Sequence, residues 1–107
     1  MPKPSKTLPP IYARPIELLQ QLIRFDTTNP PGNEGECITF IKKLMQEAGI
    51  QTTVVGKTKA RPNLVARQKG EGRAAPLLLY GHVDVVTAAN QKWQQPPFAA
   101  NIAGGFL

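Results

Sequence analysis

Apolar residues first recur at helical spacing over positions 14–25, where they stand three or four places apart. This period places them on one face of a helix. Pro15 suits the first helical turn, because a backbone N–H at that position has no partner within the helix. We therefore predict an amphipathic helix here with one face to bury. Its apolar positions are Ile16, Leu19, Leu22 and Ile23.

A polar, proline-containing turn over 26–32 separates this helix from a second one. Asn33, followed three residues later by Glu36, resembles a capping box and predicts the helix start. Gly49 predicts its end, because glycine readily adopts the left-handed conformation that terminates many helices. The apolar stripe between them is Cys37, Ile38, Ile41, Leu44, Met45 and Ala48.

Three short runs after the second helix have strand character. Residues 50–55 and 63–67 are rich in β-branched residues or alternate between apolar and polar, which is typical of strands. Residues 76–80 are apolar almost throughout, which favours a central strand covered on both faces by helices. The order of elements predicts a layered α/β fold, with two helices followed by a mixed sheet that has a buried central strand.

Composition limits the domain organisation and the location of the protein. We expect residues 1–12 to form a flexible, proline-rich lead-in and 13–107 to form one domain. Hydrophobic residues make up 41% of the chain and charged residues 19%, and no apolar run approaches the roughly 20 residues of a membrane-spanning helix. The single cysteine, Cys37, has no partner for an internal disulfide. A small buried apolar role in the cytoplasm is therefore expected for it.

The net charge of +6 raises the question of a nucleic-acid partner. Basic residues do cluster within 57–73, but no aromatic residue or nucleic-acid-binding motif accompanies them. A phosphate-binding patch remains an alternative, and we favour a solvated loop and hairpin without a nucleic-acid or membrane partner. The cluster consists of Lys57, Lys59, Arg61, Arg67, Lys69 and Arg73.

His82 and Asp84 directly follow the apolar run 76–80. Ligand sites of open α/β sheets lie beyond the carboxyl ends of central strands, so this position favours an active-site rim. Residues two apart in an extended segment project to the same side, which places the Asp84 carboxylate beside the His82 ring. The carboxylate would accept the proton of one ring nitrogen and leave the other as a metal ligand. The alternative is a hydrogen-bonded structural histidine.

The segment LLYGHVDVV at 78–86, together with 93–98 and 102–107, closely resembles a known enzyme family. The family contains acetylornithine deacetylases, succinyl-diaminopimelate desuccinylases, aminoacylases and glutamate-releasing carboxypeptidases. Residues 26–34 are similar to the segment between the first two helices of that family. The resemblance covers nearly the whole chain from position 16 onward.

This resemblance implies a zinc-dependent, sometimes cobalt-dependent, metallopeptidase-like hydrolase with two metal ions. Such enzymes split the amide bond of N-acyl amino acids or dipeptide-like substrates. The histidine that matches His82 ligates one metal ion, and the aspartate that matches Asp84 orients that histidine and counts as catalytic. Asp26, Glu34 and Glu36 are alternative ligands, but their places near a helix start favour capping and dipole interactions.

The sequence departs from the family pattern in two respects. Gly104 stands where the family usually has an acidic residue, in a turn to which we assign no function. The family also continues beyond the position of Leu107 into the bridging aspartate, the general-base glutamate and a dimerising domain. We therefore expect an N-terminal part of the catalytic domain, inactive by itself, with dimerisation confined to the complete enzyme.

Two further alternatives stay open from the sequence. The chain is either such a hydrolase fragment or a small autonomous binding module that retains the front of the enzyme fold. Trp93 and Phe98, in a proline-rich loop, either line a substrate entrance or hold the loop against the core.

Overall fold

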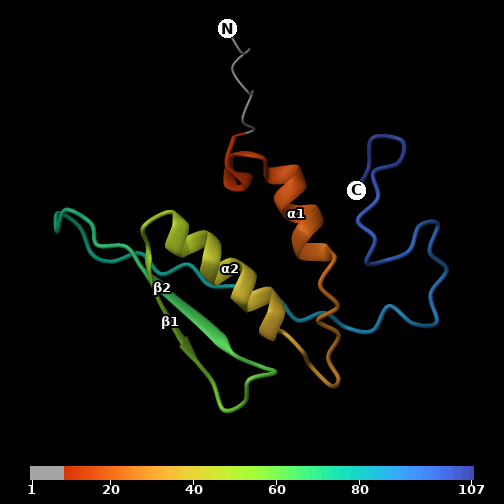
Figure 1. The fold of residues 1–107 in the computed structure, drawn as a ribbon, viewed down its shortest axis with the longest axis horizontal. Helices are drawn as coiled ribbons and strands as arrows, with labels where there is room; N and C mark the ends of the chain where they lie inside the picture. The colour runs from red at the N-terminus through yellow and green to blue at the C-terminus, as the bar shows by residue number, and fades with distance from the viewer. Residues whose placement is uncertain (1–8) are drawn as a thin grey trace, which may run out of the picture.

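The computed structural model describes residues 9–107 and contains two α-helices and a two-stranded sheet (Figure 1). Residues 1–8, the larger part of the predicted lead-in, lie outside the described residues. In chain order the elements are the 3-10 turn η1 (Ile11–Ala13), α1 (Pro15–Ile23), α2 (Gly35–Glu47), β1 (Gln51–Val55) and β2 (Asn63–Arg67). None of the helices within 9–107 has the length and apolar character needed to cross a membrane.

The first predicted helix is confirmed as α1, with Pro15 at the start of the helix. Arg14 at the N-cap position pairs with Glu17 in the first turn. The apolar face of α1 is only partly covered, since Ile16 remains 61% exposed. Packing against the rest of the chain is therefore weak along this helix.

The second predicted helix is also confirmed, but its start differs from the prediction. α2 begins at Gly35 instead of Asn33, and no side chain caps it, so the predicted capping box is wrong. The backbone N–H groups of Glu34 and Gly35 instead donate to the carbonyl of Ala60, at 2.8 and 3.2 Å. This carbonyl takes the place of a capping side chain, because it occupies donors that have no partner within the helix.

The end of α2 follows the prediction. Gly49 has φ +78°, in the left-handed region, directly after the C-cap residue Ala48. Cys37 is 2% exposed and Ile38 is 8% exposed, so the start of the apolar stripe is buried. Burial raises the pKa of the Cys37 thiol, in keeping with the predicted small apolar role.

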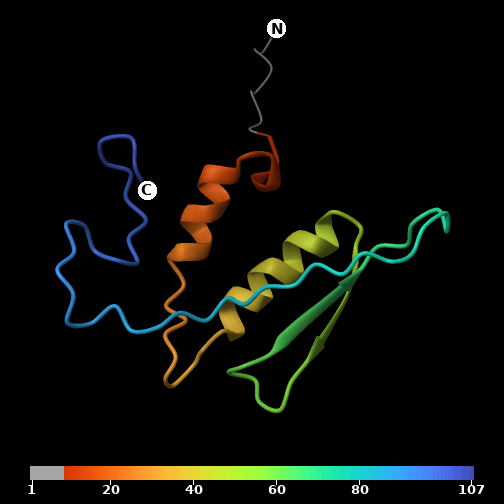
Figure 2. The ribbon, with the colours of Figure 1, turned by 180° about the vertical axis from the view of Figure 1, so that it is seen from behind.

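The predicted strands over 50–55 and 63–67 are confirmed as an antiparallel hairpin. The register pairs Gln51 with Arg67 at one end and Val55 with Asn63 at the other. α2 packs along this hairpin, and the helix and the hairpin lie side by side in both views (Figures 1 and 2). The result is a small α/β arrangement, as the pattern predicted.

The predicted buried central strand over 76–80 is wrong, and so is the mixed sheet. The only sheet among the described residues is the antiparallel pair β1–β2. Leu77 to Tyr80 form no strand and are 81–94% exposed, within an extended chain that crosses α2 in both views (Figures 1 and 2). A strand persists only where its backbone groups find a neighbour. No other strand within residues 9–107 lies alongside this segment, so its apolar side chains stay exposed.

Candidate functional site

The loop after α1 holds the extended segment that carries His82 and Asp84. The backbone N–H of Asn29 donates to the carbonyl of Val85 at 2.8 Å, and that of Val85 donates to the carbonyl of Thr27 at 3.1 Å. The Thr27 hydroxyl donates to the carbonyl of Val83 at 2.6 Å. Thr27 is only 3% exposed, so this junction is the buried anchor of the site.

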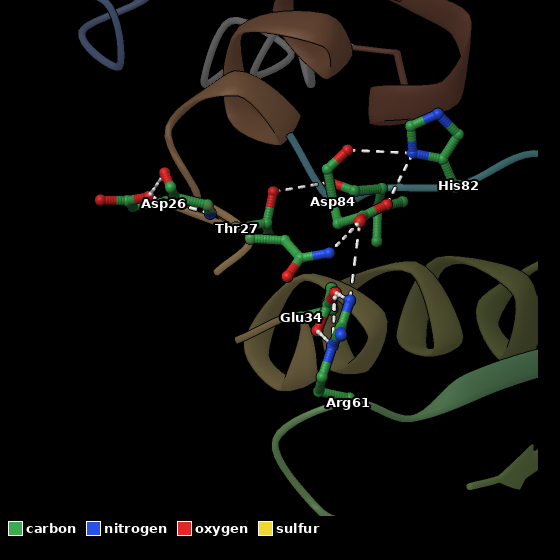
Figure 3. A network of polar contacts seen from close by, with 9 residues as sticks. Asp26, Thr27, Glu34, Arg61, His82 and Asp84 are labelled. Atoms are coloured by element: carbon green, nitrogen blue, oxygen red, sulfur yellow. Dashed lines mark hydrogen bonds and ion pairs between the residues drawn. The ribbon is translucent and has the colours of Figure 1, made fainter. Parts of the chain in front are cut away.

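His82 and Asp84 lie side by side, as their spacing predicted (Figure 3). The distance from His82 Nδ1 to Asp84 Oδ1 is 2.7 Å, and the distance from the same nitrogen to the Asp84 carbonyl is 2.9 Å. An ionised carboxylate and a carbonyl only accept hydrogen bonds, so Nδ1 carries the proton of the neutral ring. Nε2 is left with its lone pair, and the side chain is 84% exposed. Such a nitrogen can ligate a metal ion or accept a proton.

The second oxygen of Asp84 has its own partners. The Asn29 side-chain amide donates to Oδ2 at 3.1 Å, and the Arg61 guanidinium lies 3.5 Å from the same oxygen. The hydrogen bond from Asn29, followed by that from His82 and by the positive charge of Arg61, lowers the pKa of Asp84. Asp84 is therefore ionised at neutral pH, as its contact with the ring requires.

Arg61 also forms an ion pair with Glu34 near the site. Its Nε lies 3.1 and 3.2 Å from the two carboxylate oxygens of Glu34, and its Nη2 lies 2.8 Å from Oε1. Glu34 is 6% exposed, and its hydrogen bonds with Arg61 lower its pKa while they raise that of Arg61. The buried acid is therefore ionised and paired, and Figure 3 shows the pair directly beside Asp84.

The other carboxylates considered as ligands do not join His82. Asp26 accepts hydrogen bonds from the backbone and hydroxyl of Thr28, at 3.1 and 2.5 Å, and these lower its pKa. Glu36 lies in the first turn of α2. Across residues 9–107, no group of three or more His, Cys, Asp or Glu side chains is placed to hold a metal ion. His82 thus stands as a single candidate ligand with one supporting carboxylate.

The aromatic residues of the proline-rich loop lie next to this region. The Trp93 indole N–H donates to the carbonyl of Ala88 at 2.9 Å, which holds the loop on itself. Trp93 and Phe98 also line a shallow surface groove together with Asp26 and Thr28. The hydrogen bond lies within the loop itself, and a role of the two aromatic residues at a substrate entrance stays a prediction.

Sequence reasoning did not identify Asn29, Glu34 and Arg61 as parts of one network with Asp84. Arg61 was assigned to the solvated basic segment. Its side chain is 43% exposed, against 85% for Arg73, and it is paired with the buried Glu34. Glu34 and Arg61 are 27 residues apart, so no local period relates them. The available signal was the pair of glycines, Gly32 and Gly35, on either side of an acid near a helix start.

The chain is similar to curated proteins named as desuccinylases. It is 34% identical over 94 residues to a probable succinyl-diaminopimelate desuccinylase of Staphylococcus aureus strain Mu50, and 35% identical over 85 residues to that of strain MRSA252. It is 33% identical over 94 residues to the succinyl-diaminopimelate desuccinylase of Hahella chejuensis. The first of these alignments covers 86% of this chain and 22% of the relative, and the last covers 86% and 23%.

The chain thus spans less than a quarter of the length of these relatives. No family model matches the chain, and no solved structure matches it. The resemblance seen in the sequence is confirmed for proteins that bear the desuccinylase name, as similarity to a part of them.

Proposed function

We propose that this chain is part of a metal-dependent hydrolase that cleaves the amide bond of an N-acylated amino acid, with N-succinyl-diaminopimelate as the first substrate to test. One observation carries the proposal: Asp84 Oδ1 lies 2.7 Å from His82 Nδ1 and holds the proton on that nitrogen, which leaves Nε2 of the exposed ring free. Histidine ligands of metals usually have such a hydrogen-bond partner on their second nitrogen. The similarity to proteins named desuccinylases supports the choice of substrate.

The donor set of the chain fits one ligand position of a zinc site. Imidazole is a common zinc ligand, but a catalytic zinc site usually has three protein ligands. Within residues 9–107, His82 is the one candidate placed to serve. A bound zinc or cobalt ion would supply a Lewis acid and an activated water. In the proposal, the remaining ligands, the general base and any dimer contacts belong to other parts of the complete enzyme, and the 107 residues are inactive alone.

The residues of this chain have distinct tasks in the proposed reaction. His82 would ligate the metal ion through Nε2. Asp84 keeps the Nδ1 proton in place, which fixes the tautomer and the ring orientation and raises the basicity of the ligand. Asn29 and Arg61 hold the far oxygen of Asp84, so that the carboxylate stays ionised and directed at the ring.

The test is the zinc-dependent release of succinate from N-succinyl-diaminopimelate, measured for the protein encoded by the complete gene and for the 107-residue chain. We expect activity in the former and none in the latter. His82→Ala should abolish turnover, and Asp84→Ala should lower it by about 100-fold, the upper end for such a supporting carboxylate. Arg73→Gln, at an exposed position of the basic segment, is the matched control and should retain full activity. Undiminished turnover with His82→Ala would contradict the proposal.

The binding-module alternative is favoured by one feature, the exposed apolar run from Leu77 to Tyr80. Exposed apolar surface of this kind marks sites of protein association. Under this alternative the 107-residue chain would unfold cooperatively as a monomer, and the complete gene would encode no further hydrolase sequence. Sequencing beyond the codon of Leu107 and one thermal unfolding experiment separate the two functions.

A further inference from the structure

The loop between the two strands is held against the start of α2 by its backbone. The carbonyl of Ala60 accepts hydrogen bonds from the N–H groups of Glu34 and Gly35. A side chain at position 35 would not be compatible with this contact, because a Cβ there would lie 2.8 Å from the carbonyl oxygen of Lys59. This close approach fixes the position of the next residue in the loop, Arg61.

A second glycine leaves room for the side chain of Arg61. Gly32 has φ +82°, and a Cβ on it would lie 2.3 Å from Arg61 Nε and 2.6 Å from Arg61 Cζ. The left-handed backbone favours glycine at this position, and the guanidinium fills the space that a side chain there would take. The guanidinium passes directly over the backbone of the turn.

Glu34 fixes the orientation of the guanidinium in that space. It faces both Nε and Nη2 of Arg61 in a bidentate arrangement, and it is almost fully buried. Such fork-to-fork pairs constrain geometry as well as contributing energy. A buried carboxylate also requires a compensating charge, so Glu34 and Arg61 keep each other in place.

The held guanidinium lies between two carboxylates. Its Nη2 is 2.8 Å from Glu34 Oε1 and 3.5 Å from Asp84 Oδ2. His82 contacts the opposite oxygen of Asp84, so the two basic groups hold the carboxylate from its two sides. Without the positive charge between them, Glu34 and Asp84 would repel each other, and the Asp84 side chain would keep only its hydrogen bonds with Asn29 and His82.

We propose that Arg61 is a positioning residue, which holds Asp84 in the rotamer that keeps the proton of His82 on Nδ1. The importance of this for turnover rests on the function proposed above, but the positioning itself is a property of the chain without metal. Arg61 pairs with the buried Glu34 and lies 3.5 Å from Asp84. Arg73 also has an ion pair, but its partner Glu71 is exposed and its own side chain is 85% exposed.

The test uses the fact that His82 is the only histidine in the chain. Its two ring nitrogens give unambiguous ¹⁵N NMR signals, which report the ratio of the Nδ1–H to the Nε2–H tautomer in the metal-free chain at a pH where the ring is neutral. We expect Nδ1–H to predominate. Arg61→Gln should lower the ratio by about twofold or more, because the ion pair of Arg61 with Asp84 is lost. Arg61→Lys should also lower it, since lysine lacks the bidentate fork.

Arg73→Gln is the control and should leave the ratio unchanged. Urea unfolding of each variant separates positioning from stability, because a merely structural arginine would shift the midpoint and leave the tautomer of the folded chain unaltered. An unchanged ratio in folded Arg61→Gln or Arg61→Lys would overturn the proposal.

A further measurement needs no substitution and decides the matter where the variants do not fold. We expect hydrogen exchange of the Arg61 Nε–H in the unaltered chain to be clearly slower than that of Arg73. Equal exchange rates would show that the guanidinium is not held, and would overturn the proposal. Failure of the protein encoded by the complete gene to bind zinc would refute the proposed function. It would leave the tautomer ratio and the exchange rates of the 107-residue chain as they are.

Discussion

Replacement of Leu78 by lysine should reduce the self-association that we expect of the isolated chain. Leu77, Leu78 and Leu79 are 81–83% exposed, so contact with another molecule would bury nearly all of each side chain. Full burial of one leucine contributes about 1.5–3 kcal/mol. Loss of one such contribution weakens association by at least roughly tenfold, since about 1.4 kcal/mol corresponds to a factor of ten.

Sedimentation velocity from low to high micromolar concentration measures this effect. The original chain should form larger species as the concentration rises, and Leu78→Lys should remain largely monomeric. Val65→Lys is the matched control, because Val65 is a half-exposed position of the hairpin that does not belong to the apolar run. A monomeric original chain that unfolds cooperatively would refute the reasoning, as would equal association of the two lysine variants.

Three further predictions concern stability and metal binding. Gly49→Ala should destabilise the chain by about 1–2 kcal/mol in urea unfolding, because φ of Gly49 is +78°. The control Gly70→Ala should not destabilise it, and equal effects of the two variants would be inconsistent with the left-handed end of α2. The pKa of Glu34 lies below its ordinary value of 4.5, so the stability that Glu34 contributes should be complete above pH 4.5 and lost as the pH falls through its folded-state pKa. Arg61→Gln should flatten this pH dependence in acid unfolding, and an unchanged slope would refute the prediction. Calorimetry at neutral pH should detect no tight zinc site; submicromolar stoichiometric binding abolished by His82→Ala would show that other ligands converge.

The helices and the hairpin could be predicted because their signals are local. Helical spacing over 14–25 and β-branched runs near 51–55 depend only on neighbouring residues. The burial of 76–80 could not be predicted in this way, because a continuous apolar run says only that the segment would be buried where partners exist. Its exposure follows from the absence of a neighbouring strand within residues 9–107.

The site divides along the same line. His82 and Asp84 are two positions apart, so their contact follows from the geometry of an extended chain. The Arg61 pair with Glu34 depends on how the loop between β1 and β2 meets the start of α2, through hydrogen bonds between backbone groups. Side-chain identity therefore carried no direct signal of this contact, apart from the glycines that allow it.

The most direct test of the central claim is a zinc titration followed on the ¹⁵N signals of the His82 ring. We expect the Nε2 signal to shift on zinc binding while Nδ1 keeps its proton. Asp84→Asn should weaken the apparent affinity by about 10-fold to 100-fold, because the supporting carboxylate is lost. The claim would be contradicted if Nδ1 lost its proton to zinc, or if Asp84→Asn bound zinc as well as the original chain does.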